Sequence, residues 1–227
     1  MSDTLKEAAA RAALVEVRSG TVLGLGSGST AEAFLRVLAD AVQRGDLHDL
    51  RGVPTSRRTE HAARRLGIEL TDLPEDGVDL AIDGMDEVDP QLNALKGLGG
   101  ALLREKLVAE SAHRFVLIGD DGKAVARLGE RSPLPVEVLA FGVEHTAQRL
   151  SSLGLETRLR GGSLEPFLSD NGNPILDAVL TPDADLARLA RALEAVPGVM
   201  GHGLFLSLAE VAYLAGPDGV ERRERPN

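Results

Sequence analysis

The stretch TVLGLGSGST at residues 21–30 constrains the fold more than any other part of the chain. Its first residues, TVL, are apolar and suit a short buried strand, and from Ala31 onward apolar residues recur at the spacing of one helix face. The glycines therefore lie in a turn between a strand and a helix. We expect Ser29 to cap this helix, with Glu32 completing a capping box.

A turn of this kind favours an anion, because a helix start offers unpaired N–H groups and the positive end of the helix dipole. A dinucleotide site would need a glycine at position 29, where this chain has serine, and an acidic residue after the second strand. The second strand ends instead in GVPTSRRT. We expect a monophosphate bound by backbone amides and by Ser27, Ser29 and Thr30, with an ordinary glycine turn as the alternative.

Strands and helices alternate through the first half of the chain. After an N-terminal helix, strands are predicted at residues 21–26, 50–53, 68–70, 78–82 and 114–119, and helices at 31–45, 59–66 and 101–112. Alternation indicates an α/β fold with a mostly parallel, Rossmann-like sheet and helices on both faces. Ligands of such sheets bind beyond the carboxyl ends of the strands.

The order of elements changes after RSPLP at residues 131–135. Strands are predicted at residues 136–140, 156–160, 174–179 and 199–205, and helices at 145–153 and 185–195, with an extra strand near 166–168 as an alternative. This β-α-β-β-α-β order is that of a smaller, ferredoxin-like α+β domain. The tail at 208–224 predicts a strand and turn that rejoin the first sheet. We therefore predict a catalytic α/β domain of residues 1–131 and 205–227, with an inserted domain at 132–204.

Composition excludes several classes of function. The chain has 227 residues, 35 acidic against 25 basic, and a net charge of −10, which argues against nucleic-acid and anionic-membrane partners. It contains no cysteine, and its five histidines show no HExxH-like spacing, so we expect no metal site. No apolar run has the length of a signal peptide core or a membrane span. We expect a cytoplasmic protein.

Carboxylates gather in VDLAIDGMDEVD, at the end of a predicted strand. They are Asp83, Asp86, Glu87 and Asp89. A solvated turn explains such a cluster by itself, and Mg²⁺ is a second alternative. Asp83, however, follows the strand on the side of the sheet where the turn at residues 24–30 emerges, and Lys96 supplies positive charge without an ion.

The segment NALKGLGGALLREKLVAE at residues 93–110 combines a glycine loop with a helix start. Lys96 at the entrance of the loop could meet an oxyanion, and the glycines let the backbone approach a ligand closely. Glu105 shares a helix face with small and apolar residues, namely Ala101, Leu102, Val108 and Ala109. Such neighbours desolvate the carboxylate and raise its pKa, as a general base requires. The alternative is an ordinary surface glutamate between Arg104 and Lys106.

The stretches GLGSGST, DGMDEVD and KGLGGALLREKLVA, in this order and spacing, resemble the type A ribose-5-phosphate isomerase family. The resemblance extends over almost the whole chain, including SPLPVEV, DNGNPILD and PGVMGHGLF. It implies an enzyme of the pentose phosphate pathway that interconverts D-ribose 5-phosphate and D-ribulose 5-phosphate through an enediolate. It also implies a homo-oligomer, commonly a dimer, that needs neither a metal nor an organic cofactor.

The resemblance also assigns residues. Glu105 corresponds to the proton-transferring glutamate. For such a reaction we expect Lys96 and the amides at 97–100 to stabilise the oxyanion, and Asp83 and Asp86 are our candidates for opening the sugar ring. The family's substrate loops fall on Ser27, Gly28, Ser29 and Thr30; on Asp83, Gly84, Met85 and Asp86; on Lys96, Gly97, Leu98 and Gly99; and on Lys123, with a weaker match at Lys6. Leu98 and Met85 depart from the family's usual glycine and alanine. Neither departure removes a charged group, and only Leu98 bears on the path of the loop at 96–100.

Two other functions fit parts of the sequence. A sugar-phosphate-sensing module of a regulator would use a similar sheet without catalysis, but it usually carries a basic helix-turn-helix, for which this acidic chain leaves no room. An isomerase of another sugar phosphate, such as an amino sugar, would share both fold and loops. The sequence does not discriminate among pentose phosphates.

Overall fold

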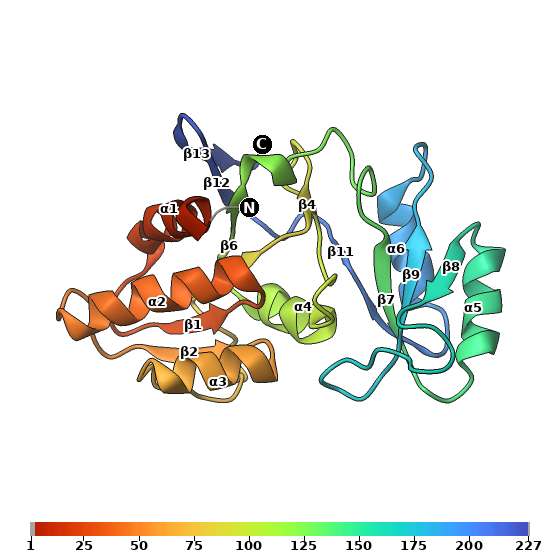
Figure 1. Ribbon diagram of the computed structural model, residues 1–227, viewed down its shortest axis with the longest axis horizontal. Helices are drawn as coiled ribbons and strands as arrows, with labels where there is room; N and C mark the ends of the chain where they lie inside the picture. Colours follow the sequence, from red (N-terminus) through yellow and green to blue (C-terminus); the bar gives the residue numbers. More distant parts are fainter. Residues whose placement is uncertain (1–2, 227) are drawn as a thin grey trace.

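The structure is a computed structural model that describes residues 3–226 (Figure 1). The larger part of the protein is built on a six-stranded sheet. Its strand order is β13-β12-β6-β3-β1-β2, and every neighbouring pair except β12 and β13 is parallel. The strands are β1 (Val22–Leu25), β2 (Arg51–Pro54), β3 (Leu80–Gly84), β6 (Phe115–Asp120), β12 (Val211–Gly216) and β13 (Gly219–Glu224). The prediction of a mostly parallel sheet, rejoined by the tail, is confirmed.

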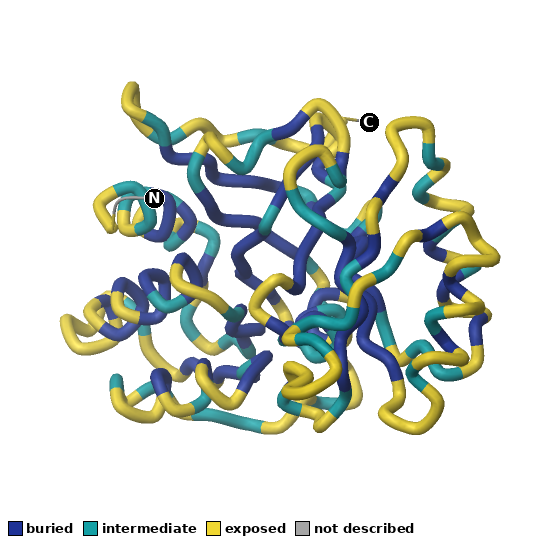
Figure 2. Tube along the Cα trace, turned by 45° about the vertical axis from the view of Figure 1, so that its right-hand side comes forward, coloured by how far each residue is buried: buried dark blue, intermediate teal, exposed yellow. Residues whose placement is uncertain are grey.

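Helices cover both faces of this sheet. They are α1 (Asp3–Ala13), α2 (Ser29–Gln43), α3 (Arg57–Arg65) and α4 (Leu102–Ser111), with 3₁₀ turns at η1 (Leu14–Glu16) and η2 (Asp121–Lys123). Side chains alternate along β6: Val116 and Ile118 pack in one core with α1 and α2, whereas Phe115 and Leu117 pack in a second core with α4. The central strands β3, β6 and β12 between these two cores are almost completely buried (Figure 2).

The start of α2 differs from the prediction. Gly28 occupies the N-cap position with φ of 90°, Ser29 is already helical, and no side chain caps the helix. Glu32 does not close a capping box, because its carboxylate pairs with Arg58 of α3. Glycine adopts this backbone conformation without steric cost. The first-turn N–H groups of α2 are thus left without a side-chain acceptor.

The second part of the chain folds on a four-stranded antiparallel sheet of order β10-β7-β9-β8. Its elements are β7 (Leu134–Val138), α5 (Val143–Ser152), β8 (Glu156–Leu159), β9 (Ile175–Val179), α6 (Leu186–Glu194) and β10 (Val199–His202). They form a separate apolar core and confirm the β-α-β-β-α-β order. The domain boundaries at 131/132 and 204/205 stay a prediction.

A small third sheet was not foreseen. It contains β4 (Glu87–Val88), β5 (Ala94–Leu95) and β11 (Leu204–Phe205). The expected single strand at 199–205 breaks at Gly203, where a Cβ atom would lie 2.1 Å from the Lys96 carbonyl oxygen. Two expected short strands are single bridges instead, Gly52 with Leu70 and Leu168 with Pro174. Two-residue strands carry no periodicity that a sequence pattern can reveal.

Candidate active site

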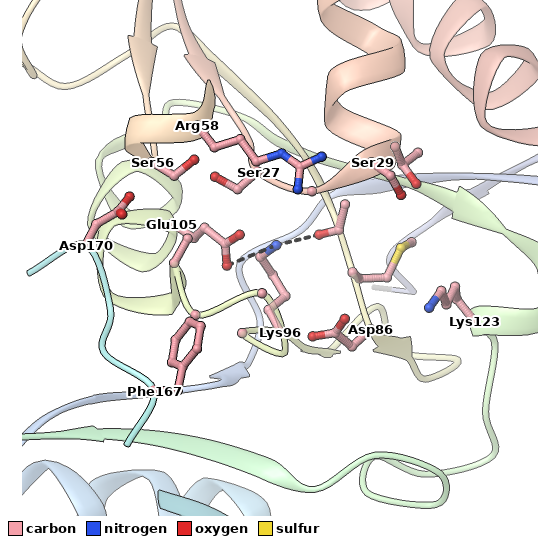
Figure 3. Close-up of a pocket in the computed structure, with 18 of the residues that line it drawn as sticks. Ser27, Ser29, Ser56, Arg58, Asp86, Lys96, Glu105, Lys123, Phe167 and Asp170 are labelled. Atoms are coloured by element: carbon pink, nitrogen blue, oxygen red, sulfur yellow. Dashed lines mark hydrogen bonds and ion pairs between the residues drawn. The ribbon is translucent and has the colours of Figure 1, made fainter. Parts of the chain in front are cut away.

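A cavity of about 260 Å³ lies at the carboxyl ends of β1 and β3 (Figure 3). The end of β1 points toward the second sheet (Figure 1). The walls of the cavity come from the β1–α2 turn, the segment after β3, the glycine loop at 96–100, α4, and residues 167–170 of the β8–β9 connection. The position agrees with the rule for ligands of parallel sheets. Every motif singled out in the first half of the sequence contributes to it.

Lys96 is the centre of the buried charges (Figure 3). Its Nζ lies 3.0 Å from Asp83 Oδ2 and 3.4 Å from Glu105 Oε2, and it donates a hydrogen bond of 2.5 Å to the Gly84 carbonyl. Burial alone would lower the pKa of Lys96, but the nearby carboxylates of Asp83, Glu105 and Asp86 raise it above its ordinary value. The side chain is therefore a fixed positive charge at one end of the cavity floor.

Asp83 supports Lys96 from behind and does not line the cavity. Its Oδ1 accepts hydrogen bonds from the backbone N–H groups of Ser27 (2.9 Å) and Gly84 (2.7 Å). Burial raises the pKa of Asp83, and the Lys96 ammonium opposes that shift. The carboxylate thus ties the β1–α2 turn to the end of β3 and fixes the ammonium between them.

Glu105 lies in the first turns of α4 and points into the cavity. Its side chain is 6 % exposed, and Oε2 contacts the Lys96 ammonium without hydrogen-bond geometry. Burial raises the pKa of Glu105 to about 8; Lys96 opposes this shift, and the charges of Asp83 and Asp86 add to it. Of the four neighbours predicted to desolvate it, Leu102, Val108 and Ala109 are buried, whereas Ala101 is half-buried and lines the cavity. A carboxylate of this kind can remove a proton near neutral pH.

The other end of the cavity presents donors. Ser29, Thr30 and Lys123 line it beside the uncapped start of α2. Ser27 also lines the cavity, but its hydroxyl is held by Thr55 Oγ1 at 2.7 Å and its N–H by Asp83. Hydroxyls, an ammonium and a helix N-terminus together make a site for a phosphate group.

Most of the predicted site residues line this one cavity. They are Ser27, Gly28, Ser29, Thr30, Gly84, Met85, Asp86, Lys96, Gly97, Gly99, Glu105 and Lys123. Leu98 is outside the lining and 41 % exposed, although its N–H donates to Asp86 Oδ2 at 2.9 Å. Lys6 is outside it as well, with its Nζ 3.1 Å from Asp3 Oδ1.

Sequence reasoning missed part of the wall. The lining residues that it did not name are Ser56, Arg58, Phe167, Leu168 and Asp170, whereas Gly100 of the glycine loop and Ala101 beside Glu105 were named and line the cavity too. The segment containing Ser56 and Arg58 follows β2, at the same sheet edge as the β1–α2 turn, so strand topology could have pointed to it. In the β8–β9 connection, Asp170 begins the DNGNPILD stretch of the resemblance, but nothing in the sequence indicated that this stretch reaches the site. Asp170 Oδ2 accepts from the Arg57 N–H at 2.7 Å, across 113 residues of sequence.

Neither a metal cluster nor a spanning helix is seen in the described part of the chain. Among residues 3–226, no group of three or more histidine, aspartate or glutamate side chains has an arrangement that could hold a metal ion. No helix within the same residues combines the length and apolarity needed to cross a membrane. The need for a cofactor stays untested, and its absence remains a prediction.

Three comparisons agree on the family. The profile of ribose 5-phosphate isomerase A (phosphoriboisomerase A) matches residues 51–219. The chain is 52 % identical to ribose-5-phosphate isomerase A of Roseiflexus castenholzii, covering 100 % of this chain and 98 % of that protein. It is 49 % identical to the protein of that name from Chloroflexus aurantiacus, covering 97 % of this chain and 93 % of the relative.

Solved structures give the same result. The ribose 5-phosphate isomerase from Plasmodium falciparum superposes with a TM-score of 0.95 at 38 % identity, covering 100 % of both chains. A D-ribose-5-phosphate isomerase in complex with phospho-erythronic acid superposes with a TM-score of 0.94 at 34 % identity, covering 99 % of this chain and 100 % of that one. With a cavity formed by the family's motifs and relatives matched from end to end, the chain belongs to the ribose 5-phosphate isomerase A family.

Proposed function

We propose that this protein interconverts D-ribose 5-phosphate and D-ribulose 5-phosphate. Family membership supports the reaction, and the bound phospho-erythronic acid of a relative supports a phosphorylated sugar acid or sugar as the ligand class. The observation that carries the proposal is the pair of Glu105 and Lys96, a carboxylate of raised pKa beside a buried ammonium at one end of a cavity whose other end suits phosphate.

Glu105 is the proposed base. In the open-chain aldose, the C1 carbonyl acidifies the C2 proton, which Glu105 removes to leave an enediolate. The C1 oxygen gains a proton and the C2 hydroxyl loses one, and Glu105 returns its proton to C1, so the ketone forms at C2 with no net gain or loss of atoms. One base serves both carbons because they are adjacent.

Lys96 and the loop amides at 97–100 stabilise the negative charge that develops on oxygen. The ammonium is held in place by Asp83 before substrate arrives, so little reorganisation is needed during the reaction. Asp86 lines the cavity and is the better placed of the two aspartates to exchange a proton with the sugar ring as it opens. Asp83 then acts through Lys96.

Ser29, Thr30 and Lys123 bind the phosphate in this proposal. Their hydroxyls and ammonium line the cavity, and the first turn of α2 adds N–H donors. Ser27 shapes the turn instead of binding directly, because its hydroxyl and N–H are already occupied by Thr55 and Asp83.

The test compares Glu105→Gln with wild type in an assay of purified protein on ribose 5-phosphate, after dialysis against EDTA. The variant keeps the shape of the side chain but cannot accept a proton, so kcat should fall by at least about a hundredfold. Glu110→Gln, an exposed position on the same helix, is the matched control. Binding without turnover in the wild type would point to a sensing module, and near-normal kcat in Glu105→Gln would remove this residue as the base.

We also propose that the protein is a homodimer and works in the cytoplasm, in the non-oxidative branch of the pentose phosphate pathway. Two large apolar side chains near the end of the second sheet support self-association: Phe141 is 88 % exposed and Met200 is 44 % exposed. Light scattering on the purified chain measures the mass directly. A monomer across the working concentration range would contradict the dimer.

A further inference from the structure

Arg160, at the end of β8 in the second sheet, reaches across to the glycine loop of the cavity. Its Nη1 donates to the carbonyl oxygens of Gly97 at 3.1 Å and Leu98 at 2.9 Å. These contacts join positions more than 60 residues apart in sequence. They are made to the two peptide units that shape the loop after Lys96.

Contacts outside the loop also hold the Arg160 guanidinium in place. Asp177 on β9 pairs with it through two hydrogen bonds, at 3.0 Å and 2.5 Å, and the side chains of Arg160 and Asp177 are only 15 % and 21 % exposed. The Phe167 ring lies 5.6 Å from the guanidinium carbon and packs against Gly100, where a Cβ atom would lie 2.5 Å from the ring. Because Asp177 and Phe167 already restrain the planar guanidinium, it loses little conformational entropy when it binds the loop.

Holding the two carbonyls also sets the direction of the N–H groups that follow them. In a planar trans peptide the N–H points away from the preceding carbonyl, so a carbonyl bound to Arg160 turns the next N–H to the opposite side. Leu98 shows this directly, since its N–H reaches Asp86 Oδ2 at 2.9 Å. The Gly99 N–H is turned away from Arg160 by the same geometry, and no hydrogen bond occupies it within residues 3–226.

We propose that Arg160 is a positioning residue of the isomerase site, which aims the Gly99 N–H at the oxyanion of the enediolate and fixes Leu98 against Asp86. Gly99 lines the cavity, and the space around its missing Cβ is open. This inference rests on the proposed function, because it assigns a role in stabilising the charge that the proposed reaction creates. It makes the second sheet part of the catalytic site, not a support beside it.

The test compares Arg160→Met, directly after β8, with Arg158→Met, an exposed position on β8 itself. Arg160→Met should lower kcat on ribose 5-phosphate by about tenfold or more, within the range for a misaligned oxyanion donor, and change KM by less than about threefold. Affinity for phospho-erythronic acid, whose carboxylate mimics the enediolate oxygens, should fall with kcat. Affinity for inorganic phosphate should stay near wild type, and Arg158→Met should behave as wild type in all three measurements.

Two further variants keep the test decisive if Arg160→Met does not fold. Arg160→Lys retains the charge but not the fork, and Asp177→Asn releases the guanidinium from its partner, so both should show the same pattern at smaller amplitude. If Arg160 had a purely structural role, its variants would have a lower thermal midpoint but one of two other results. Either kcat would be unchanged, or the affinities for phosphate and phospho-erythronic acid would fall equally. Each of these results would overturn the proposal. A wild type without isomerase activity would instead overturn the proposed function.

Discussion

Lys96 Nζ lies 3.4 Å from Glu105 Oε2, and both side chains are almost completely buried at one end of the cavity. Each group shifts the pKa of the other, and the two shifts are in opposite directions. Glu105 helps to keep the ammonium charged, whereas the ammonium only partly offsets the burial that raises the pKa of Glu105. The site therefore holds a permanent cation beside a carboxyl that gains and loses its proton near neutrality, which is the combination that proton transfer next to a developing oxyanion requires.

The first prediction is the pH dependence of catalysis. Since Glu105 must be ionised to act as the base and burial raises its pKa to about 8, kcat/KM for ribose 5-phosphate should rise with pH through about 8. Lys96 should not add a falling limb below pH about 10, because its pKa is raised above the ordinary lysine value. Initial rates from about pH 5 to about pH 10 measure this. An acid limb in the ordinary carboxyl range of about 4 would leave the rate flat from about pH 5 upward, and this result would show that Glu105 is not desolvated in solution.

The second prediction concerns the free energy of unfolding, which falls as the Glu105 carboxyl ionises. Between its unfolded pKa of about 4.3 and its folded pKa of about 8, Glu105 binds more proton in the folded state than in the unfolded state. Its contribution to the free energy of unfolding therefore falls as pH rises through this window. Urea unfolding near pH 5 and near pH 8 should show wild type losing more stability than Glu105→Gln. Equal losses in the two proteins would contradict the raised pKa, and Glu110→Gln controls for the loss of one surface charge.

The phosphate end of the cavity gives the third prediction. Replacing both Ser29 and Thr30 by alanine removes hydroxyl donors worth roughly 1.5–3 kcal/mol each toward a charged group, so KM for ribose 5-phosphate should rise by at least about tenfold. Turnover of unphosphorylated ribose should hardly change. The control is the double variant Ser151→Ala with Ser152→Ala, whose hydroxyls only bond to the backbone of α5. Equal losses on both sugars would indicate that Ser29 and Thr30 support the fold and not the phosphate.

Local signals were enough to predict the half of the site that the large sheet supplies. The strand, glycine turn and helix around residues 21–43 follow from periodicity, and the burial of Glu105 follows from neighbours one helical turn away. The carboxyl ends of parallel strands meet at one sheet edge, which places the motif of Asp86 beside that turn. Lys96 follows β5 of the small third sheet, so this rule does not place it there. The error at Ser29 has a local cause too: Gly28 can take the N-cap position, so the hydroxyl is not needed there.

The other half of the site depends on how two separately folded sheets pack. Arg160 ends the strand predicted at 156–160, and Asp170 begins the DNGNPILD stretch, but neither pattern indicates what these side chains contact. Their role, and that of Phe167, appears only when this connection meets the loop at 97–100 and the start of α3. Asp83 was predicted as a group that meets the sugar, but it lies behind Lys96 and binds two backbone N–H groups. Sequence alone places a carboxylate at a strand end without saying which side of the neighbouring lysine it occupies.

The last prediction tests how Asp83 is held, through Gly26. A Cβ atom at Gly26 would lie 2.2 Å from Asp83 Oδ1 and 2.5 Å from Asp83 Cα. The second of these contacts is with backbone, so rotating the Asp83 side chain cannot relieve it, and the ends of β1 and β3 must move apart. Gly26→Ala should therefore lower the free energy of unfolding by about 1–3 kcal/mol, as overpacking in a core usually does.

Catalysis should suffer beyond this loss of stability, because the same movement breaks the hydrogen bond of 2.9 Å from the Ser27 N–H to Asp83 and frees the ammonium of Lys96. We expect kcat on ribose 5-phosphate to fall by about tenfold or more at a temperature where the variant is fully folded. Gly52→Ala serves as the control for stability alone, since a Cβ atom there would lie 2.3 Å from Leu25 Cδ1 in the core and Gly52 does not line the cavity. A Gly26→Ala protein that is as stable and as active as wild type would show that the contact between β1 and Asp83 is looser than the structure has it, and that Lys96 keeps its place without this support.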